Sequence, residues 1–160
     1  MRKGLSLPPY LHGGGQESNF RSGTEGLPLI AGFGAACKAA FPSLRQDILR
    51  EQKLKELCIE QLSRIPQVQM IGAADAPHII NLSVPGVRSQ GLINCLQDMD
   101  VYVSAGSACS KGYRSHVLEA MKVAPELIDG SVRVSLSRFT TEEEIQQLVK
   151  ALKHAIDTLK

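Results

Sequence analysis

The sequence has no tryptophan and few other aromatic residues, with four phenylalanines and three tyrosines among 160 residues. It therefore offers little for the stacking platforms on which single-stranded nucleic acid binds. The charges are nearly balanced as well, since 18 basic residues against 16 acidic ones give a net charge of +2. This excess is too small to favour an anionic partner. We therefore predict a protein that binds no nucleic acid.

Long hydrophobic runs are also missing. The most apolar stretch, residues 27–37, contains a proline and two glycines and is too short to span a bilayer. Pro8 and Pro9 interrupt the region where a signal peptide would need an unbroken apolar segment. The histidines show no metal-ligand spacing, and no CxxC pair occurs among the four cysteines, Cys37, Cys58, Cys95 and Cys109. A chain of this size and apolar content needs no disulfides. We predict a cytoplasmic protein without a membrane segment or a metal.

The regular part of the sequence begins near residue 27. Residues 1–27 show no helical or alternating pattern and are treated as an irregular segment, whereas residues 28–160 form one small domain. Helices are predicted at 27–41 (buried), 43–64, 89–99 (with Ser89 as N-cap), 115–122 and from 141 to the end, and strands at 68–71, 79–84, 101–104 and 132–136. This order predicts an α/β (α+β) fold, with helices on one face of a small mixed or antiparallel sheet.

The last helix carries the clearest local signals. Thr141 and Glu144 have the spacing of a capping box, in which each side chain bonds the other's backbone N–H. One apolar stripe follows at helical spacing, made of Ile145, Leu148, Val149, Leu152, Ile156 and Leu159. We expect this stripe to face the core.

Cys109 lies in a run of small residues, 104–112, that follows a predicted strand. Small neighbours leave a thiol accessible, and Lys111, Arg114 and His116, which are close in sequence, favour the thiolate. Without other information, however, a single cysteine is more often a small buried residue than a nucleophile. The residues alone leave both interpretations of Cys109 open.

Arg133 lies on a predicted strand whose alternate residues, Val132, Val134 and Leu136, form an apolar face. The arginine belongs to the opposite face, where it is either solvated or directed at a ligand. A guanidinium binds a carboxylate through two parallel hydrogen bonds, which suits an amino-acid substrate. The residues alone favour a surface arginine, with a carboxylate site as the alternative.

Glycines at positions 13–15, followed by Arg21, Gly23 and Thr24, precede the first predicted helix. Glycines, a guanidinium and a hydroxyl at the start of a helix are the ingredients of a phosphate site. The spacing matches neither GxGxxG nor GxxxxGK[ST], so the pattern is weak as a general phosphate motif.

Taken together, four segments resemble the C-terminal part of the pyridoxal-phosphate-dependent cysteine desulfurases, which belong to the class V aminotransferase family. They occur in the order GGGQESNFRSGTEGLPLIAGFGAA (residues 13–36), SAGSACSKG (104–112), SHVLEAM (115–121) and VRVSLSRFTTEEEI (132–145). The resemblance covers nearly the whole chain. It implies the small C-terminal domain of a fold-type I pyridoxal phosphate enzyme.

The resemblance also implies an activity and roles for particular residues. The enzyme would transfer sulfur from L-cysteine to its own Cys109 as a persulfide, release L-alanine, and pass the sulfur to an acceptor such as an iron–sulfur scaffold protein. Arg133 would bind the substrate carboxylate. Thr24, with Arg21 and Gly23, would contact the phosphate of the cofactor of the neighbouring subunit in a homodimer.

One family feature has no counterpart in this sequence. The lysine that holds pyridoxal phosphate stands in a serine–histidine–lysine context, which none of the lysines here has. The resemblance therefore implies a larger cofactor domain ahead of residue 1, from which residues 1–27 continue. We expect the 160-residue chain to hold no cofactor and to be inactive by itself. The alternative is a non-catalytic module that docks on a sulfur acceptor or on a separate cofactor domain.

Overall fold

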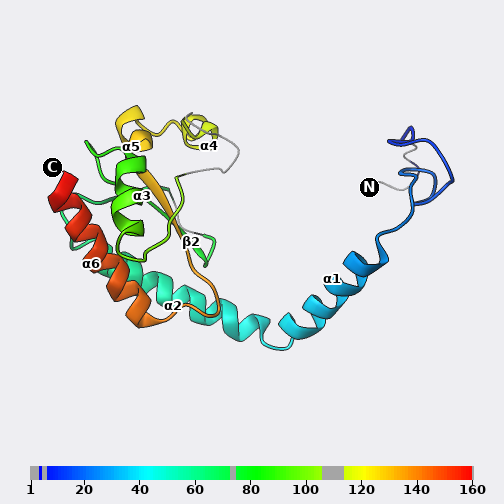
Figure 1. The fold of residues 1–160 in the computed structure, drawn as a ribbon, viewed down its shortest axis with the longest axis horizontal. Coiled ribbons are helices and arrows are strands. Elements are labelled where there is room, and N and C mark those ends of the chain that lie inside the picture. The colour runs from blue at the N-terminus through cyan, green and yellow to red at the C-terminus, as the bar shows by residue number, and fades with distance from the viewer. Residues whose placement is uncertain (1–3, 5–6, 73–74, 106–113, 160) are drawn as a thin grey trace. The chain divides into compact units, whose positions relative to one another are not determined.

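The structure is a computed structural model that describes residues 1–160 except 1–3, 5–6, 73–74, 106–113 and 160 (Figure 1). Its internal contacts divide the chain into two units, Met1–Ser43 and Leu44–Lys160, called unit 1 and unit 2 below. The division falls one helix later than the domain boundary expected at residue 27, which stays a prediction. Each unit is described by itself.

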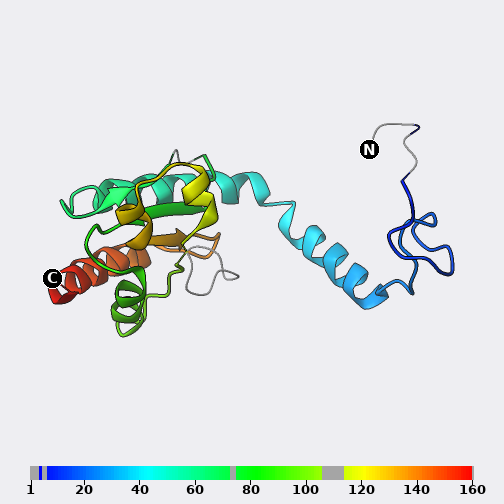
Figure 2. The same cartoon turned by 90° about the horizontal axis from the view of Figure 1, so that it is seen from above.

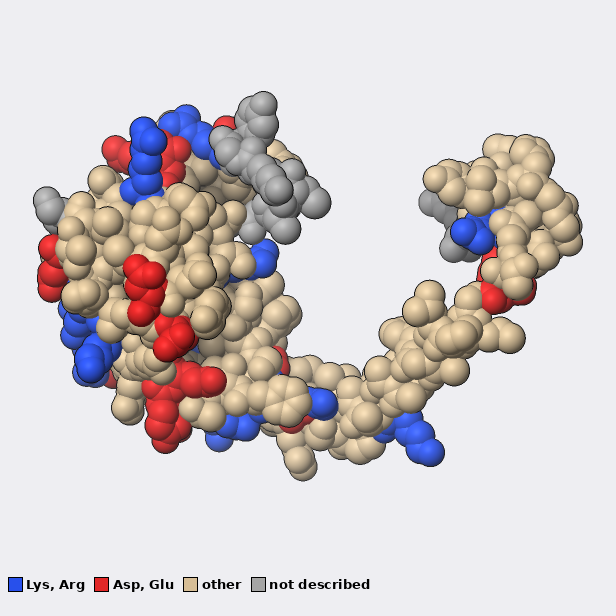
Figure 3. Space-filling view, viewed as in Figure 1, with Lys and Arg blue, Asp and Glu red and all other residues tan. Residues whose placement is uncertain are grey.

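Unit 1 consists of an irregular segment and one helix, α1 (Leu27–Ala40). Pro28 lies in its first turn, where the missing N–H of proline is no loss. The helix was predicted correctly, but its predicted burial was wrong, because no residue of α1 is buried. Leu29 is 80% exposed and Phe33 is 74% exposed, since the described residues of unit 1 contain no second helix or strand that could cover them. The surface of α1 is mostly uncharged in Figure 3, with Lys38 its single charged residue.

Unit 2 holds a three-stranded antiparallel sheet in the order β1-β2-β3. β2 and β3 lie side by side in both ribbon views (Figures 1 and 2). The elements in chain order are α2 (Leu44–Leu62), β1 (Gln69–Met70), β2 (Ile79–Ser83), α3 (Ser89–Gln97), α4 (His116–Ala120), α5 (Pro125–Asp129), β3 (Ser131–Ser135) and α6 (Glu142–Leu159). The predicted class, helices with a small antiparallel sheet, is confirmed.

The core of unit 2 forms where one face of the sheet meets helices α2, α3 and α6. On β3, Val132 and Val134 are buried, and they stand in register with Leu82 and Ile80 of β2. Four residues of the predicted α6 stripe are buried against them, namely Ile145, Leu148, Leu152 and Ile156. Because apolar residues recur every second position on β3 and every third or fourth on α6, each element presents one continuous face to the core.

The start of α6 has the predicted capping box. The Thr141 N–H donates to Glu144 Oε2 at 2.9 Å, and the Glu144 N–H donates to Thr141 Oγ1 at 3.3 Å. Two N–H groups that have no partner within the helix are satisfied in this way. The loop carrying Arg138, which follows β3, therefore enters α6 at a fixed point.

The predicted strand at residues 101–104 is the main local error. Only Ser104 pairs with β3, through two backbone hydrogen bonds with Arg133. Asp100 adopts a left-handed conformation (φ +59°), and the Gln147 side chain donates to the Met99 carbonyl, so the chain leaves α3 on a path that meets β3 only at Ser104. Helix α5 was not predicted. Ser89 is not the N-cap of α3 either, because Arg88 occupies that position without a side-chain cap bond.

Among the described residues, no single helix is long and apolar enough to cross a membrane. Helices α1 and α2 pass such a test only when they are counted together.

Gly130, which joins α5 to β3, has no room for a side chain. A Cβ atom there would lie 2.5 Å from the Val84 carbonyl oxygen and 2.9 Å from that of Val87. We expect Gly130→Ala to lower the free energy of unfolding of the chain by about 2 kcal/mol, because backbone atoms must shift. Urea denaturation followed by circular dichroism measures this change.

Gly91→Ala in α3 is the matched control. A Cβ at residue 91 would only touch Leu159 at 3.8 Å, an ordinary contact. The substitution should stabilise the helix by about 0.5–1 kcal/mol, because alanine loses less backbone entropy there. Equal effects of the two substitutions would contradict the steric account of Gly130.

Candidate functional site

Arg133 lies at the centre of β3, between the buried residues Val132 and Val134. Strand alternation directs it to the opposite face of the sheet, where it is half-buried and in register with Asn81 of β2. Its backbone pairs with Ser104 on the other side, with N···O distances of 3.1 and 2.7 Å. The backbone of Arg133 is therefore held from both edges of the strand.

The Nε atom of Arg133 is buried and has no hydrogen-bond partner among the described residues. Leaving a buried donor unpaired costs roughly 1–3 kcal/mol, more for a charged group. Such an atom is a position where an acceptor from a ligand is favoured. Because the guanidinium presents its N–H groups as a planar fork, a carboxylate is the ligand that fits it best. The carboxylate interpretation of Arg133 is thus favoured over that of a fully solvated arginine.

The segment that contains Cys109 starts from the same place. Ser104 is bonded to Arg133, and Cys109 follows five residues later in the sequence. Cys109, together with Lys111, lies outside the described residues, so the predicted role of its thiol stays a prediction. The described geometry brings the beginning of this segment to the Arg133 backbone.

The three predicted phosphate-binding residues lie in unit 1, just ahead of α1. Arg21, Gly23 and Thr24 are all exposed. Gly23 has φ +132°, a backbone conformation that favours glycine. Its N–H donates to Gln16 Oε1 at 3.2 Å.

The exposed guanidinium of Arg21 and hydroxyl of Thr24 are each suitable donors for a phosphate. This part of the chain therefore fits the phosphate end of pyridoxal phosphate. The structure does not place these unit 1 residues relative to Arg133.

The other cysteines behave as structural residues. Cys58 is fully buried on α2, as its position in the apolar stripe predicts, and burial raises the pKa of its thiol to about 11. Cys37 and Cys95 are half-buried, and all three are free thiols. Within the described part of the chain, no group of three or more histidine, cysteine or acidic side chains is placed to hold a metal ion.

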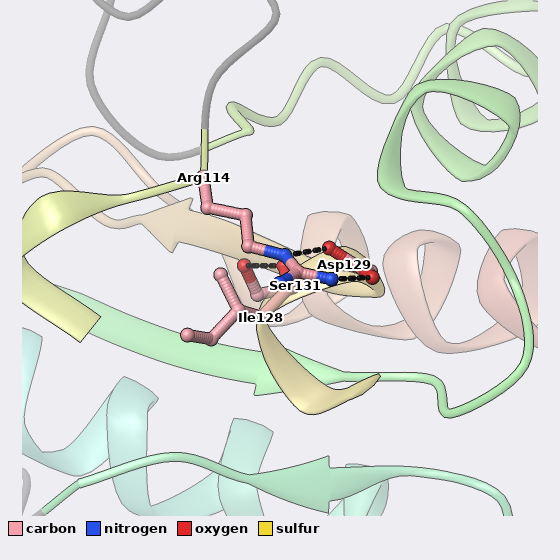
Figure 4. Close-up of polar contacts among 4 residues, drawn as sticks. All are labelled: Arg114, Ile128, Asp129 and Ser131. Atoms are coloured by element: carbon pink, nitrogen blue, oxygen red, sulfur yellow. Dashed lines mark hydrogen bonds and ion pairs between the residues drawn. The ribbon is translucent and has the colours of Figure 1, made fainter. Parts of the chain in front are cut away.

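Two further features were missed by the sequence analysis. A cavity of about 270 Å³ opens where residues 101–103 separate from β3, and its polar lining comes from Asp100, Ser135, Thr140, Glu144 and Gln147. Arg133 is not among the residues that line it. The second feature is an ion pair between Arg114 and Asp129, 15 residues apart, for which the sequence contains no local signal (Figure 4).

Unit 2 is a domain of helices packed on a small antiparallel sheet, and Arg133 lies on the edge strand β3. The family model described as aminotransferase class-V matches residues 4–148 of the chain. The chain belongs to this family, as its sequence motifs predicted.

Proteins similar to this chain are cysteine desulfurases. Cysteine desulfurase IscS of Methanosarcina thermophila is 33% identical over 100% of this chain and 41% of its own length. IscS of Rickettsia akari is 37% identical over 98% of this chain and 39% of its own. The solved structure of a NifS-like protein from Rickettsia africae has a TM-score of 0.83 at 30% identity, covering 96% of this chain and 41% of that one. The chain therefore spans about 40% of the length of these relatives.

The burial of Cys58 has a direct chemical consequence. Because the thiolate is the reactive form, a pKa of about 11 keeps Cys58 unreactive near pH 8. We expect iodoacetamide to modify Cys58 in the folded chain far more slowly than the half-buried Cys95. Mass spectrometry of the tryptic peptides measures both, and unfolding in urea should make the two rates similar. Fast modification of Cys58 before unfolding would contradict the buried position.

Proposed function

We propose that the chain is the part of a cysteine desulfurase that binds the substrate carboxylate and carries the sulfur. The complete enzyme would transfer sulfur from L-cysteine to Cys109 and release L-alanine. The observation that carries the proposal is the buried, unpartnered Nε of Arg133, whose backbone is bonded to the start of the segment containing Cys109. The similarity to cysteine desulfurases over the whole chain supports it.

Arg133 would bind the carboxylate of L-cysteine through its guanidinium fork. With the carboxylate fixed and the cofactor bound, the substrate would be held in one orientation for attack on its sulfur. Orientation of this kind removes much of the entropic cost of the reaction.

Cys109 would act as the nucleophile. Its thiolate attacks the substrate sulfur, so that an S–S bond forms on the enzyme while the substrate C–S bond breaks. The electron pair of that bond stays with the substrate carbon, which takes up a proton to give L-alanine. Pyridoxal phosphate, when bound, supplies the electron sink that makes this carbon a leaving group. The products are alanine and a Cys109 persulfide, which an acceptor such as an iron–sulfur scaffold protein then receives.

Arg21, Gly23 and Thr24 would contribute to the phosphate site of the cofactor, across the interface of a homodimer. The lysine and the residues that hold the pyridine ring would come from the cofactor domain. The portion of the relatives that this chain does not match is large enough for such a domain, since the chain covers only about 40% of their length.

One observation favours a second function. Helix α1 exposes Leu29 and Phe33 to 80% and 74%, an apolar surface that unit 1 does not cover. Large exposed apolar patches are typical of surfaces that bind another protein. The second candidate is therefore a non-catalytic module that docks on a sulfur acceptor or on a separate cofactor domain.

We expect the 160-residue chain alone to form no alanine from L-cysteine, because its lysines lack the family's serine–histidine–lysine context. Alanine is measured by chromatography after incubation with pyridoxal phosphate and L-cysteine. The same assay is repeated after addition of the cofactor domain of a related desulfurase. Alanine that forms only when both chains are present would favour a split enzyme over a passive module. Alanine formed by the 160-residue chain without the cofactor domain would contradict the proposal that the cofactor lysine lies in another domain.

Variants of Cys109 and Arg133 test the assigned roles in an active complete enzyme or mixture. Cys109→Ser should abolish the persulfide while cofactor absorbance is retained. Arg133→Gln should raise KM for L-cysteine by about tenfold or more, because a charge-assisted hydrogen bond contributes roughly 1.5–3 kcal/mol. Arg133→Lys is the control, because it keeps the positive charge but loses the planar pair of N–H donors. Its KM for L-cysteine should lie between those of the unmodified enzyme and Arg133→Gln. Sulfur transfer that persists in Cys109→Ser would overturn the assignment.

A further inference from the structure

Asn81 is the residue of β2 that stands directly opposite Arg133, and both residues are half-buried. Arg133 exchanges its backbone hydrogen bonds with Ser104 on the other edge of β3, whereas the Asn81 carbonyl accepts the Ile71 N–H at 2.9 Å. Asn81 and Arg133 are therefore a cross-strand pair without a backbone hydrogen bond between them. In antiparallel sheets, such pairs have the shorter Cα–Cα distance, about 4.5 Å, and the closer side chains.

The strand positions around this pair carry no charge. Since side chains alternate along a strand, the face opposite the core is formed by every second residue. No carboxylate on β2 or β3 therefore competes for the guanidinium of Arg133, and Asn81 provides the one side-chain amide that these two strands place on this face. The other positions of β2 and β3 on this face are Ile79, Ser83, Ser131 and Ser135.

The amide oxygen of Asn81 leaves the guanidinium available. Nε of Arg133 has no partner among the described residues, so Asn81 Oδ1 does not accept a hydrogen bond from it. An aspartate at position 81 would have nearly the same shape as asparagine, but it would form a cross-strand ion pair with Arg133. An asparagine at this position therefore places a polar side chain beside the guanidinium without neutralising its charge.

We propose that Asn81 is a second binding residue for the carboxylate held by Arg133, with its Nδ2 group as the donor. A carboxylate has about four acceptor positions, and a guanidinium that binds it at two points leaves the others open. An amide on the neighbouring strand donates to one of them. This inference rests on the proposed function, because Arg133 is taken there as the carboxylate site. It extends that site from one strand to two.

Acetate is the probe for this site, and acetamide, which has nearly the same shape but no charge, is its control. Each is titrated into the isotope-labelled 160-residue chain at constant ionic strength. Heteronuclear NMR follows the Nε–H signal of Arg133 and the Nδ2 amide protons of Asn81, which are identified by their absence from Arg133→Lys and Asn81→Ala. We expect acetate to shift both sets of signals with one common Kd, and acetamide to shift neither.

Variants of Asn81 measure its contribution. Asn81→Ala removes the donor and should raise the Kd of acetate about fivefold, because a hydrogen bond to a charged group is lost. Asn81→Asp keeps the shape but places a carboxylate beside Arg133, and it should raise this Kd by roughly tenfold or more. Asn94→Asp is the matched control, because it makes the same charge change at an exposed asparagine of α3, whose Oδ1 accepts from Gln90 Nε2 at 2.9 Å. This control should leave the Kd unchanged.

The outcomes separate this inference from the proposed function. If acetate does not move the Nε–H signal of Arg133 in the unmodified chain, the carboxylate site and the role of Asn81 are overturned together. If acetate moves this signal but the Kd is unchanged in Asn81→Ala, or the amide protons of Asn81 do not shift, only the role of Asn81 is overturned.

Hydrogen exchange of the Arg133 backbone N–H, which donates to the Ser104 carbonyl, reports in the same samples whether the strands remain paired. We expect this exchange to be as slow in Asn81→Ala as in the unmodified chain. A weaker affinity for acetate accompanied by fast exchange would show that Asn81 holds the strands together, which would equally overturn the inference.

Discussion

The pairing of β3 with its two neighbours is the constraint on which the rest of unit 2 depends. β2 fixes the register on one edge, and Ser104 is bonded to Arg133 on the other. Because strand side chains alternate, fixing this register commits Val132 and Val134 to the core and leaves Arg133 on the opposite face. A shift by one residue would bury the guanidinium and expose the valines. The same hydrogen bonds that stabilise the sheet therefore place the one arginine whose Nε is buried without a partner in the described part of the chain.

The elements that the sequence predicted correctly are those specified by local or periodic signals. The capping box of α6, its apolar stripe and the alternation on β3 are each read from residues within a few positions of one another. The strand predicted at residues 101–104 was wrong, because the path of this segment depends on contacts with residues distant in the sequence. Asp100 takes a left-handed conformation, and Gln147 of α6 holds the Met99 carbonyl. The β-strand propensity of residues 101–104 does not include these tertiary contacts.

The candidate site divides in the same way. Alternation alone assigned Arg133 to the face opposite the core, and the structure adds the unpartnered Nε that a pattern cannot reveal. The roles of Cys109 and Thr24 came from family resemblance and not from periodicity, because a thiol among small residues and a hydroxyl in an irregular segment have several physical interpretations. No sequence pattern indicated the Arg114–Asp129 ion pair. Its two residues are 15 positions apart, and Asp129 ends α5, a short helix that was not predicted.

Helix α1 raises the question of what a sequence can say about burial. Its composition is that of a core helix, yet Leu29 and Phe33 are exposed within unit 1. An apolar helix gains free energy only against another apolar surface, at roughly 25 cal/mol per Å² removed from water. Composition predicted a buried α1, and this prediction was wrong, because burial depends on a second apolar surface that the composition of the helix does not specify.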